Sequence, residues 1–332
     1  MRMWNALAAY YGGKRKLVSI IFNRISKVIP REKWYGMAFI DAFLGGGAVS
    51  LYAKSQGFKV TCNDIAKRSY IAGKALIKNS TKIKDEDIQK LFLLNEHNSH
   101  FIEENYVPDV FAKRHAVFLD QAFANADTEL LTYLLIKYIF HIRPYSKFSS
   151  PNAFNRPFED GRFDEIKSTY LQSIKVNLTS PLRILNAEAE NINNGIFSNG
   201  LQHKVCNMDV FKFLEDCTAE GILYLDPPYA GTLTYESEYA VLDKILGAEY
   251  PESRFSGGIE ALDELLSKAE KFPLWIISFG NAGGKNSLEE LVKIVSKYRD
   301  CKSDEFEYRH CEAMASDKHK KECREWLITA WR

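Results

Sequence analysis

A carboxylate, two prolines and an aromatic ring follow directly after a short apolar run in this sequence. Residues 221–225 read Gly-Ile-Leu-Tyr-Leu, and Asp226, Pro227, Pro228 and Tyr229 come next. Because proline fixes φ and lacks an N–H group, we expect Asp226 and the Pro227 carbonyl to form two rigid hydrogen-bond acceptors beside the Tyr229 ring. Such a corner suits a planar substrate with an exocyclic amine, whose N–H groups meet the acceptors while its ring stacks on tyrosine. The alternative is a simple exit from a strand.

Three consecutive glycines form a second candidate binding element. Gly45, Gly46 and Gly47 follow the apolar run 37–43. Glycine lets the backbone approach a ligand without a Cβ in the way, and such a turn lies at the edge of an open α/β sheet where ligands bind. A dinucleotide fingerprint would need a further glycine near position 50, where the chain has Ser50. The turn therefore gives little support to a pyrophosphate cofactor.

Two acidic residues flank this glycine turn. Asp41 precedes it, and Asp64 lies about 20 residues beyond it, the spacing at which an acid reaches ribose hydroxyls. Two carboxylates beside a glycine turn favour a cationic nucleoside over a phosphate ligand. The alternative is a plain structural turn.

A further glycine turn with a cation lies near the start of the chain. Residues 10–14 read Tyr-Tyr-Gly-Gly-Lys, so Gly12 and Gly13 permit a tight turn and Lys14 places a positive charge there. Apolar residues at helical spacing follow over 17–28. Taken alone, this segment also fits ordinary glycine punctuation before a helix.

The elements that must position these residues alternate between strand and helix. Apolar runs predict strands over 37–43, 58–64, 203–207, 221–226, 274–280, 304–310 and 325–331. Helical spacing is found over 17–28, 48–53, 65–78, 208–216 and 288–298. This alternation predicts an α/β fold with a mostly parallel sheet.

The alternation breaks between residues 91 and 200, where we expect an inserted second domain. Its stretch 141–163 is rich in aromatic residues, Pro, Ser, Asn and Arg, which predicts irregular or hairpin structure. Residues 137–183 contain eight Lys and Arg against four Asp and Glu, a modest local basic excess. We therefore expect a catalytic domain of residues 1–90 and 201–332 around an insertion of residues 91–200.

Composition limits the classes of protein. The 332 residues carry 44 Lys and Arg against 43 Asp and Glu, which excludes a global basic field for nucleic acid. Six cysteines without a CxxC pair indicate reduced thiols. No signal peptide is evident, and the apolar stretch 130–140 is too short to span a bilayer, so we expect a cytoplasmic protein. The spacing of His310, Cys311, His319 and Cys323 matches no familiar zinc pattern, and we expect no metal.

Together, Asp-Pro-Pro-Tyr at 226–229, Phe-Leu-Gly-Gly-Gly-Ala-Val at 43–49 and Tyr-Tyr-Gly-Gly-Lys at 10–14 resemble the Dam-like (D12 class) family of N6-adenine DNA methyltransferases. The motifs follow the family's order, with a long insertion before the last, and the resemblance covers nearly the whole chain. It implies a Rossmann-like methyltransferase sheet that uses S-adenosyl-L-methionine. It also implies that residues 91–200 form a target-recognition domain and that the methyl group goes to N6 of an adenine flipped out of DNA.

Carried over to this sequence, the resemblance implies two groups of site residues, and the composition of the insertion suggests a third. The catalytic group is Asp226, Pro227, Pro228 and Tyr229. The cofactor group is Tyr10, Tyr11, Gly12, Gly13, Lys14, Asp41, Phe43, Gly45, Gly46, Gly47, Asp64, Ile65, Asp209 and Val210, with Asp64 on the ribose and Asp209 at the cofactor adenine. The third group, for DNA binding, comes instead from the local basic residues of the insertion: Arg143, Tyr145, Lys147, Asn155 and Arg156. The alternative is that these side chains are merely solvated. Residues 141–148 depart from the family's usual segment, which leaves the target sequence open.

The partners implied are double-stranded DNA and no membrane, with a cognate restriction endonuclease as a further candidate, and the simplest assembly is a monomer. Two alternatives share the sheet: an RNA methyltransferase acting on adenine N6 or guanine N2, and a non-catalytic DNA-binding module. The insertion and the N-terminal Tyr-Tyr-Gly-Gly-Lys argue against the first alternative. The intact Asp-Pro-Pro-Tyr and glycine motifs argue against the second.

Overall fold

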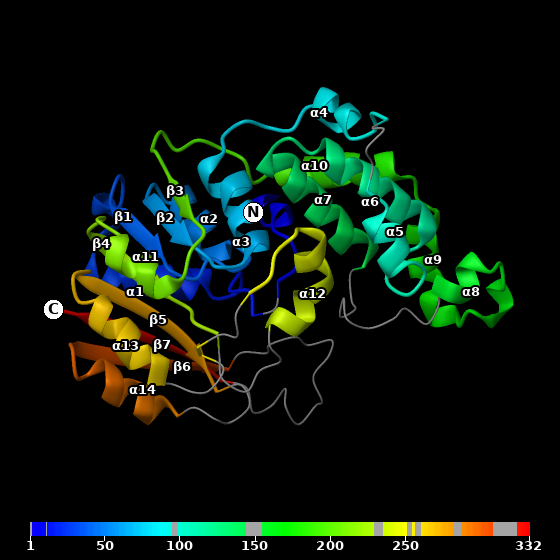
Figure 1. Cartoon of the computed structure of the whole chain (residues 1–332). Helices are drawn as coiled ribbons and strands as arrows, with labels where there is room; N and C mark the ends of the chain where they lie inside the picture. Colours follow the sequence, from blue (N-terminus) through cyan, green and yellow to red (C-terminus); the bar gives the residue numbers. More distant parts are fainter. Residues whose placement is uncertain are drawn as a thin grey trace. The chain divides into compact units, whose positions relative to one another are not determined.

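The computed structural model describes residues 2–10, 12–94, 99–143, 155–228, 235–250, 254–255, 260–281, 287–307 and 324–332 (Figure 1). Four predicted site residues lie outside these ranges: Tyr11, Tyr145, Lys147 and Tyr229. The cysteines and histidines of the segment 310–323 lie outside them too.

The chain divides into two compact units. The sheet unit comprises Tyr10–Gly73, Ser198–Thr234 and Tyr250–Arg332, and the helical unit comprises Met1–Ala9, Lys74–Phe197 and Tyr235–Glu249. The helical unit differs from the expected insertion at 91–200: it begins at Lys74, ends at Phe197, and also includes Met1–Ala9 and Tyr235–Glu249.

A seven-stranded sheet forms the centre of the sheet unit. Its strands run in the order β3-β2-β1-β4-β5-β7-β6. They are β1 (Ala38–Asp41), β2 (Lys59–Asn63), β3 (Lys204–Cys206), β4 (Gly221–Leu225), β5 (Leu274–Gly280), β6 (Asp300–Glu307) and β7 (Arg324–Trp331). The first five strands pair in parallel, and β7 lies antiparallel between β5 and β6. The predicted α/β class and mostly parallel sheet are therefore confirmed.

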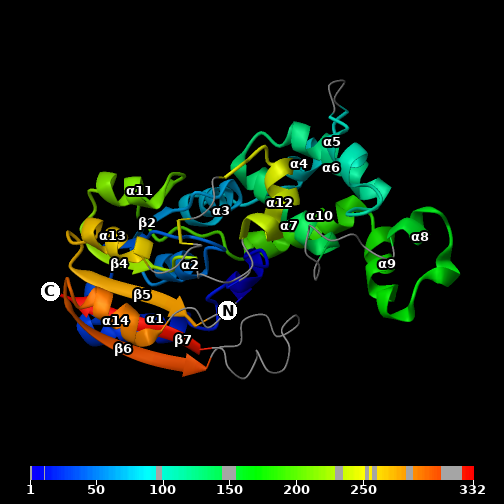
Figure 2. The ribbon, with the colours of Figure 1, turned by 60° about the horizontal axis from the view of Figure 1, so that its bottom comes forward.

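Burial explains why the apolar runs became strands of this sheet. Every residue of β4 and of β5 is buried, as expected for parallel strands covered on both faces. The edge strand β6 instead alternates between exposed and partly buried residues. Figure 2 shows β5, β7 and β6 running side by side. Strand β6 begins at Asp300, four residues before the predicted start at 304, and residues 300–303 pair with residues 328–331 of β7.

Helices cover both faces of the sheet. One core cluster packs Ile40, Leu223 and Ile277 against α11 (Val210–Asp216), α13 (Glu260–Lys268) and α14 (Leu288–Val295). On the opposite face, Phe39 stacks on Phe22 of α1 (Val18–Val28), beside α2 (Ala48–Ser55). The predicted helix over 65–78 consists of α3 (Lys67–Gly73) followed by one π-helical turn (Lys74–Lys78).

The described part of the helical unit contains helices and no strand. Its α-helices are α4 (Asp85–Lys90), α5 (Phe101–Tyr106), α6 (Lys113–Asn125), α7 (Glu129–Ile142), α8 (Asn155–Glu159), α9 (Leu171–Leu178), α10 (Pro181–Asn193) and α12 (Tyr235–Ile245). The expectation of irregular or hairpin structure is wrong for residues 155–159, which are helical, since Pro157 sits in the first turn of α8, where its missing N–H costs nothing.

The N-terminal 3-10 helix (Arg2–Ala6) is held within the helical unit by side chains of α7. The Tyr133 hydroxyl donates to the Ala6 carbonyl at 2.9 Å, and Lys137 Nζ donates to the Asn5 carbonyl at 2.9 Å. Lys137 also pairs with Glu188 of α10 at 3.1 Å, so its buried charge is balanced. Among the described helices, none is long and apolar enough to cross a membrane.

Candidate active site

Four carboxylates lie at one edge of the sheet, each just after or at the end of a parallel strand. Asp41 ends β1, Asp64 follows β2, Asp209 follows β3 and Asp226 follows β4. The register pairs Asp41 with Tyr224, which places Asp226 beyond β4 on the same edge as Asp41. Ligands of open α/β sheets bind at this carboxyl edge, so the edge is the candidate active site.

Asp226 is held by an ion pair with Lys14. The Lys14 ammonium lies 2.9 Å from Asp226 Oδ1 and 3.3 Å from Glu325 Oε1, and it donates to the Gly12 carbonyl at 3.1 Å. The side chains of Lys14 and Glu325 are only 4% and 1% exposed, whereas that of Asp226 is 18% exposed. Asp226 is therefore the member of this cluster that a substrate can reach.

The glycine turn is shaped by Asp64. Gly45 has a φ of 52° and Gly47 a φ of 78°, conformations that favour glycine. Asp64 Oδ2 accepts from the Gly45 N–H at 2.7 Å, and Oδ1 accepts from the Ala66 N–H at 2.9 Å. A Cβ at position 46 would lie 2.8 Å from the Tyr10 Cβ, so Tyr10 packs directly against the turn. The glycine turn is thus in direct contact with both the N-terminal motif, through Tyr10, and Asp64.

Asp41 is a buried carboxyl. Its Oδ2 accepts from the Ser50 hydroxyl at 2.7 Å, and its Oδ1 accepts from the Phe43 N–H at 3.3 Å. Burial raises the pKa of Asp41 to about 7; the Ser50 hydrogen bond opposes this rise, and the negative charge of Asp226 adds to it. In the sequence, Ser50 indicated only that a glycine fingerprint is incomplete. In the structure, its hydroxyl group binds the Asp41 carboxyl group.

This pKa shift predicts a pH-dependent stability. The carboxyl keeps its proton to about pH 7 in the folded protein, but only to about the ordinary pKa of 3.8 in the unfolded chain. The contribution of Asp41 to stability is therefore fully present below pH 3.8 and is lost as the pH rises through 7. Between pH 5 and pH 7 the free energy of unfolding should fall by about 2 kcal/mol more in the unmodified protein than in Asp41→Asn. Urea unfolding at both pH values measures this difference. An equal change in the free energy of unfolding in the two proteins would contradict the raised pKa of Asp41.

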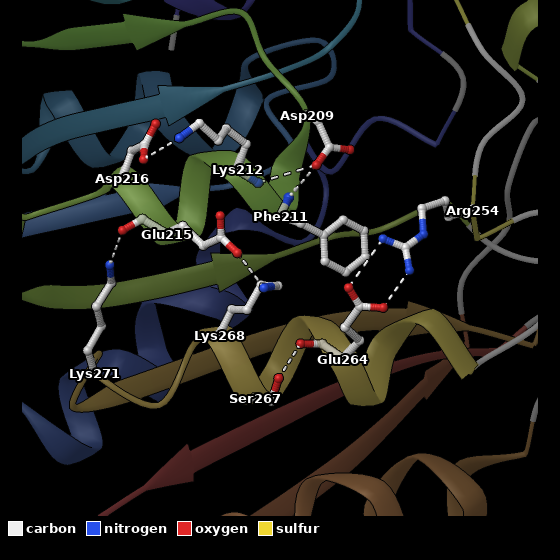
Figure 3. A network of polar contacts seen from close by, with 10 residues as sticks. All are labelled: Asp209, Phe211, Lys212, Glu215, Asp216, Arg254, Glu264, Ser267, Lys268 and Lys271. Carbon is white, nitrogen blue, oxygen red and sulfur yellow. Dashed lines mark hydrogen bonds and ion pairs between the residues drawn. The ribbon is translucent and has the colours of Figure 1, made fainter.

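Asp209 caps helix α11 at the next strand end. Its Oδ1 accepts from the Phe211 N–H at 2.9 Å and from the Lys212 N–H at 3.3 Å. Figure 3 shows Asp209 at the start of α11, with the Arg254 guanidinium over the Phe211 ring and paired with Glu264 of α13. An ion pair between Lys268 of α13 and Glu215 of α11 also links these two helices (Figure 3). The carboxylate is thus fixed in place by the helix that follows it.

Apolar side chains accompany these acids. Ile65, directly after Asp64, is 43% exposed. Phe43 lies edge-on to Phe255 with ring centroids 5.6 Å apart, and Phe255 stacks on Phe211 at 6.0 Å. Val210 is buried in the core cluster, so its side chain contributes packing rather than an exposed surface.

The described residues of the predicted DNA-binding group differ in exposure. Arg143 is 3% exposed and donates to the Val110 carbonyl at 3.1 Å; burial lowers its pKa to about 10. Asn155 is buried as well and accepts from Asn177 at 3.1 Å. Arg156 is exposed and pairs with Asp109 at 3.0 Å. Arg156 is therefore accessible to a ligand, whereas Arg143 and Asn155 are buried and make hydrogen bonds within the helical unit.

Glu325 and Ser278 are site residues whose contacts the sequence did not predict. The Ser278 hydroxyl of β5 donates to Glu325 Oε1 of β7 at 2.7 Å, beneath Lys14. The apolar runs around both residues predicted strands, and the family resemblance placed residues 278–281 at a strand end behind the active site. Neither indicated that Ser278 and Glu325 contact each other. Within the described ranges, no group of three or more His, Cys, Asp or Glu residues is arranged to hold a metal ion.

Comparison with known proteins agrees with this geometry. A family model for the D12 class of N6 adenine-specific DNA methyltransferases matches residues 10–275. The Type II methyltransferase M2.HphI of Haemophilus parahaemolyticus is 27% identical over 307 residues, which cover 87% of this chain and 87% of that protein. The resemblance drawn from the three motifs is confirmed, and with it an enzyme that methylates adenine in DNA rather than an RNA methyltransferase or a non-catalytic module. Since the match spans most of the chain and includes both glycine motifs and Asp226, the chain belongs to the D12 class of N6 adenine-specific DNA methyltransferases.

Proposed function

We propose that the carboxyl edge of the sheet unit binds S-adenosyl-L-methionine beside Asp226, and that Asp226 and the Pro227 carbonyl receive the N6 amino group of an adenine flipped out of double-stranded DNA. The observation that carries this proposal is the position of Asp226: it is partly exposed, fixed by Lys14, and on the same edge as Asp41, Asp64 and the glycine turn.

The residues at this edge suit such a cofactor. Each oxygen of Asp64 already accepts one backbone N–H, but a carboxylate oxygen has two acceptor sites, so both retain capacity for ribose hydroxyls. The exposed Ile65 side chain offers an apolar face for an adenine ring, and Asp209 stands at the next strand end. When bound, the cofactor supplies an electrophilic methyl group. The carboxyl groups at this edge favour a cationic ligand over a phosphate.

Asp226 acts on a poor nucleophile. The lone pair of adenine N6 is delocalised into the ring, and hydrogen bonds from its two protons to Asp226 and the Pro227 carbonyl favour a pyramidal nitrogen. As N6 gains its bond to carbon and the carbon–sulfur bond breaks, the carboxylate stabilises the positive charge that develops on N6. N6 then loses one proton, for which Asp226 is the nearest proposed acceptor. Alignment of the reacting atoms contributes up to ~7–11 kcal/mol in well-oriented systems.

The helical unit is the proposed target-recognition part. Its exposed ion pair between Arg156 and Asp109 contributes little to stability, so Arg156 can exchange Asp109 for a phosphate. Arg143, Asn155, Tyr145 and Lys147 remain proposed members of the DNA-binding group, the last two of them outside the described residues. Tyr229, also outside them, is proposed to stack on the flipped base.

The biological role of this activity is proposed from the name of the related protein M2.HphI. Its Type II name supports a restriction-modification role and a cognate restriction endonuclease for this chain. We propose that the enzyme acts as a monomer in the cytoplasm, where its cysteines stay reduced.

Nucleoside mass spectrometry tests the proposed reaction. The purified protein is incubated with duplex DNA or structured RNA and with cofactor carrying a deuterated methyl group. Deuterated N6-methyladenine is expected in the DNA arm alone. Label in cytosine, or in RNA at a higher yield than in DNA, would overturn the proposal. Sequencing that detects modified bases in the same DNA then gives the target site.

A further inference from the structure

A buried network connects the catalytic corner to the far strands of the sheet. Lys14 lies between Asp226, at the end of β4, and Glu325, at the start of β7. Ser278 of β5 completes the network by donating to Glu325. In the antiparallel register, Ser278 is opposite Leu327 and Glu325 is opposite Gly280, so the two side chains are diagonal neighbours on one face of the sheet.

Burying the charges of Lys14 and Glu325 is unfavourable for folding, which suggests that the network serves the function of the site. Glu325 is only 1% exposed and Lys14 only 4%, and a buried charge is destabilising unless it is paired and hydrogen-bonded. A well-packed apolar pair at these positions would give similar or greater stability. The pair instead delivers an ammonium group to within 2.9 Å of the one carboxylate in the cluster that a substrate can reach.

We propose that Lys14, Glu325 and Ser278 are positioning residues for Asp226, and that Lys14 is not primarily a cofactor ligand. Lys14 sets the orientation of the Asp226 carboxylate and keeps it ionised, and Glu325 and Ser278 anchor Lys14 from below. This inference rests on the proposed role of Asp226 in the reaction. Ser278 and Glu325 lie beyond residue 275, where the family match ends.

The surroundings of Asp226 explain why it needs a cation. Asp41 of β1 and Asp226 interact unfavourably, and burial raises the pKa of Asp41 to about 7. Tyr224 of β4 is also near, and Glu325 adds a second negative charge behind Lys14. Among these groups, Lys14 supplies the positive charge that opposes protonation of Asp226. Loss of Lys14 should therefore raise the pKa of Asp226, so that activity lost near neutral pH returns at higher pH.

The test is the single-turnover rate of methyl transfer to unmethylated plasmid DNA, with cofactor affinity measured separately by calorimetry. Lys14→Met should lower the rate about 100-fold at pH 7, the loss typical of a reacting group misplaced by about 1 Å. The acidic limb of its pH–rate profile should move to higher pH, and the Kd of the cofactor should stay within about threefold. Lys14→Arg, which restores the charge, should return the limb towards its original position.

Two milder variants keep the test decisive if Lys14→Met does not fold. Ser278→Ala and Glu325→Gln should each lower the rate about threefold to tenfold with cofactor Kd unchanged, because each weakens the anchor of Lys14. The matched controls are Lys297→Met, whose surface pair is with Asp263, and Glu307→Gln on the edge strand β6. Both controls should have the unmodified rate.

Three results would overturn the inference. A loss of cofactor affinity in proportion to the rate makes Lys14 a cofactor ligand, and a rise in the KM for DNA alone makes it a DNA contact. An unchanged rate and pH profile in Lys14→Met removes the positioning role altogether. Each outcome leaves the proposed function standing as long as the unmodified protein methylates adenine and Asp226→Ala does not.

Discussion

Replacement of Asp226 by alanine should lower the single-turnover rate of methyl transfer by about 10³-fold. The change removes one of the two acceptors for the N6 amine and the negative charge that stabilises N6 as it becomes positive. Folding should survive, because Lys14 keeps its ion pair with Glu325 at 3.3 Å and its bond to the Gly12 carbonyl. Cofactor affinity should change by less than about threefold, since the cofactor is held mainly by other strand ends.

The comparison for this variant separates chemistry from binding. Single-turnover rates at saturating cofactor and DNA report the chemical step, and calorimetry reports the Kd of the cofactor. Asp226→Asn, which keeps one carbonyl acceptor, should fall between the alanine variant and the unmodified protein. Asp263→Ala, a surface carboxylate paired with Lys297, is the matched control and should be fully active. A parallel loss of rate and cofactor affinity in Asp226→Ala would contradict the catalytic role.

Asp64→Ala should weaken cofactor binding about 100-fold and leave the saturated rate within about tenfold. Hydrogen bonds to a charged group contribute about 1.5–3 kcal/mol each, and two lost ribose bonds at the lower end of this range together correspond to roughly two powers of ten in Kd. The variant also removes the acceptor of the Gly45 and Ala66 N–H groups, so the glycine turn loses the contacts that shape it.

The control for this change is Asp216→Ala, an exposed carboxylate in the same unit that pairs with Lys212 at 2.9 Å. It should bind the cofactor with the unmodified Kd. Calorimetric titrations of both variants decide the assignment. A Kd unchanged by Asp64→Ala would remove Asp64 from the cofactor site.

The sheet and its carboxyl edge were predictable because both follow from local sequence. Apolar runs such as 221–225 and 274–280 are buried on both faces of a parallel sheet, and such runs have few other stable arrangements. Carboxyl ends of parallel strands meet at one edge. Asp41, Asp64 and Asp226 could therefore be assigned to one site from their positions after apolar runs.

The contacts of Lys14 with Asp226 and Glu325 could not be predicted, because these residues are distant in sequence and no local pattern indicates that they meet. Glu325 stands at the start of a terminal strand, where an acidic residue normally faces water, yet it is buried beneath Lys14. Part of the helical unit was predicted wrongly for another reason. Turn-forming residues over 141–163 predicted irregular or hairpin structure, but residues 155–159 are helical, and Arg143 turns inward onto the Val110 carbonyl.

The most direct measurement is a crystal structure of the enzyme with S-adenosyl-L-homocysteine and a duplex containing the target adenine. We expect an extruded adenine whose N6 lies within about 3.2 Å of both an Asp226 carboxylate oxygen and the Pro227 carbonyl, facing the cofactor sulfur. An adenine that remains stacked in the duplex, or an N6 group bound by other residues while Asp226 contacts only Lys14, would contradict this expectation.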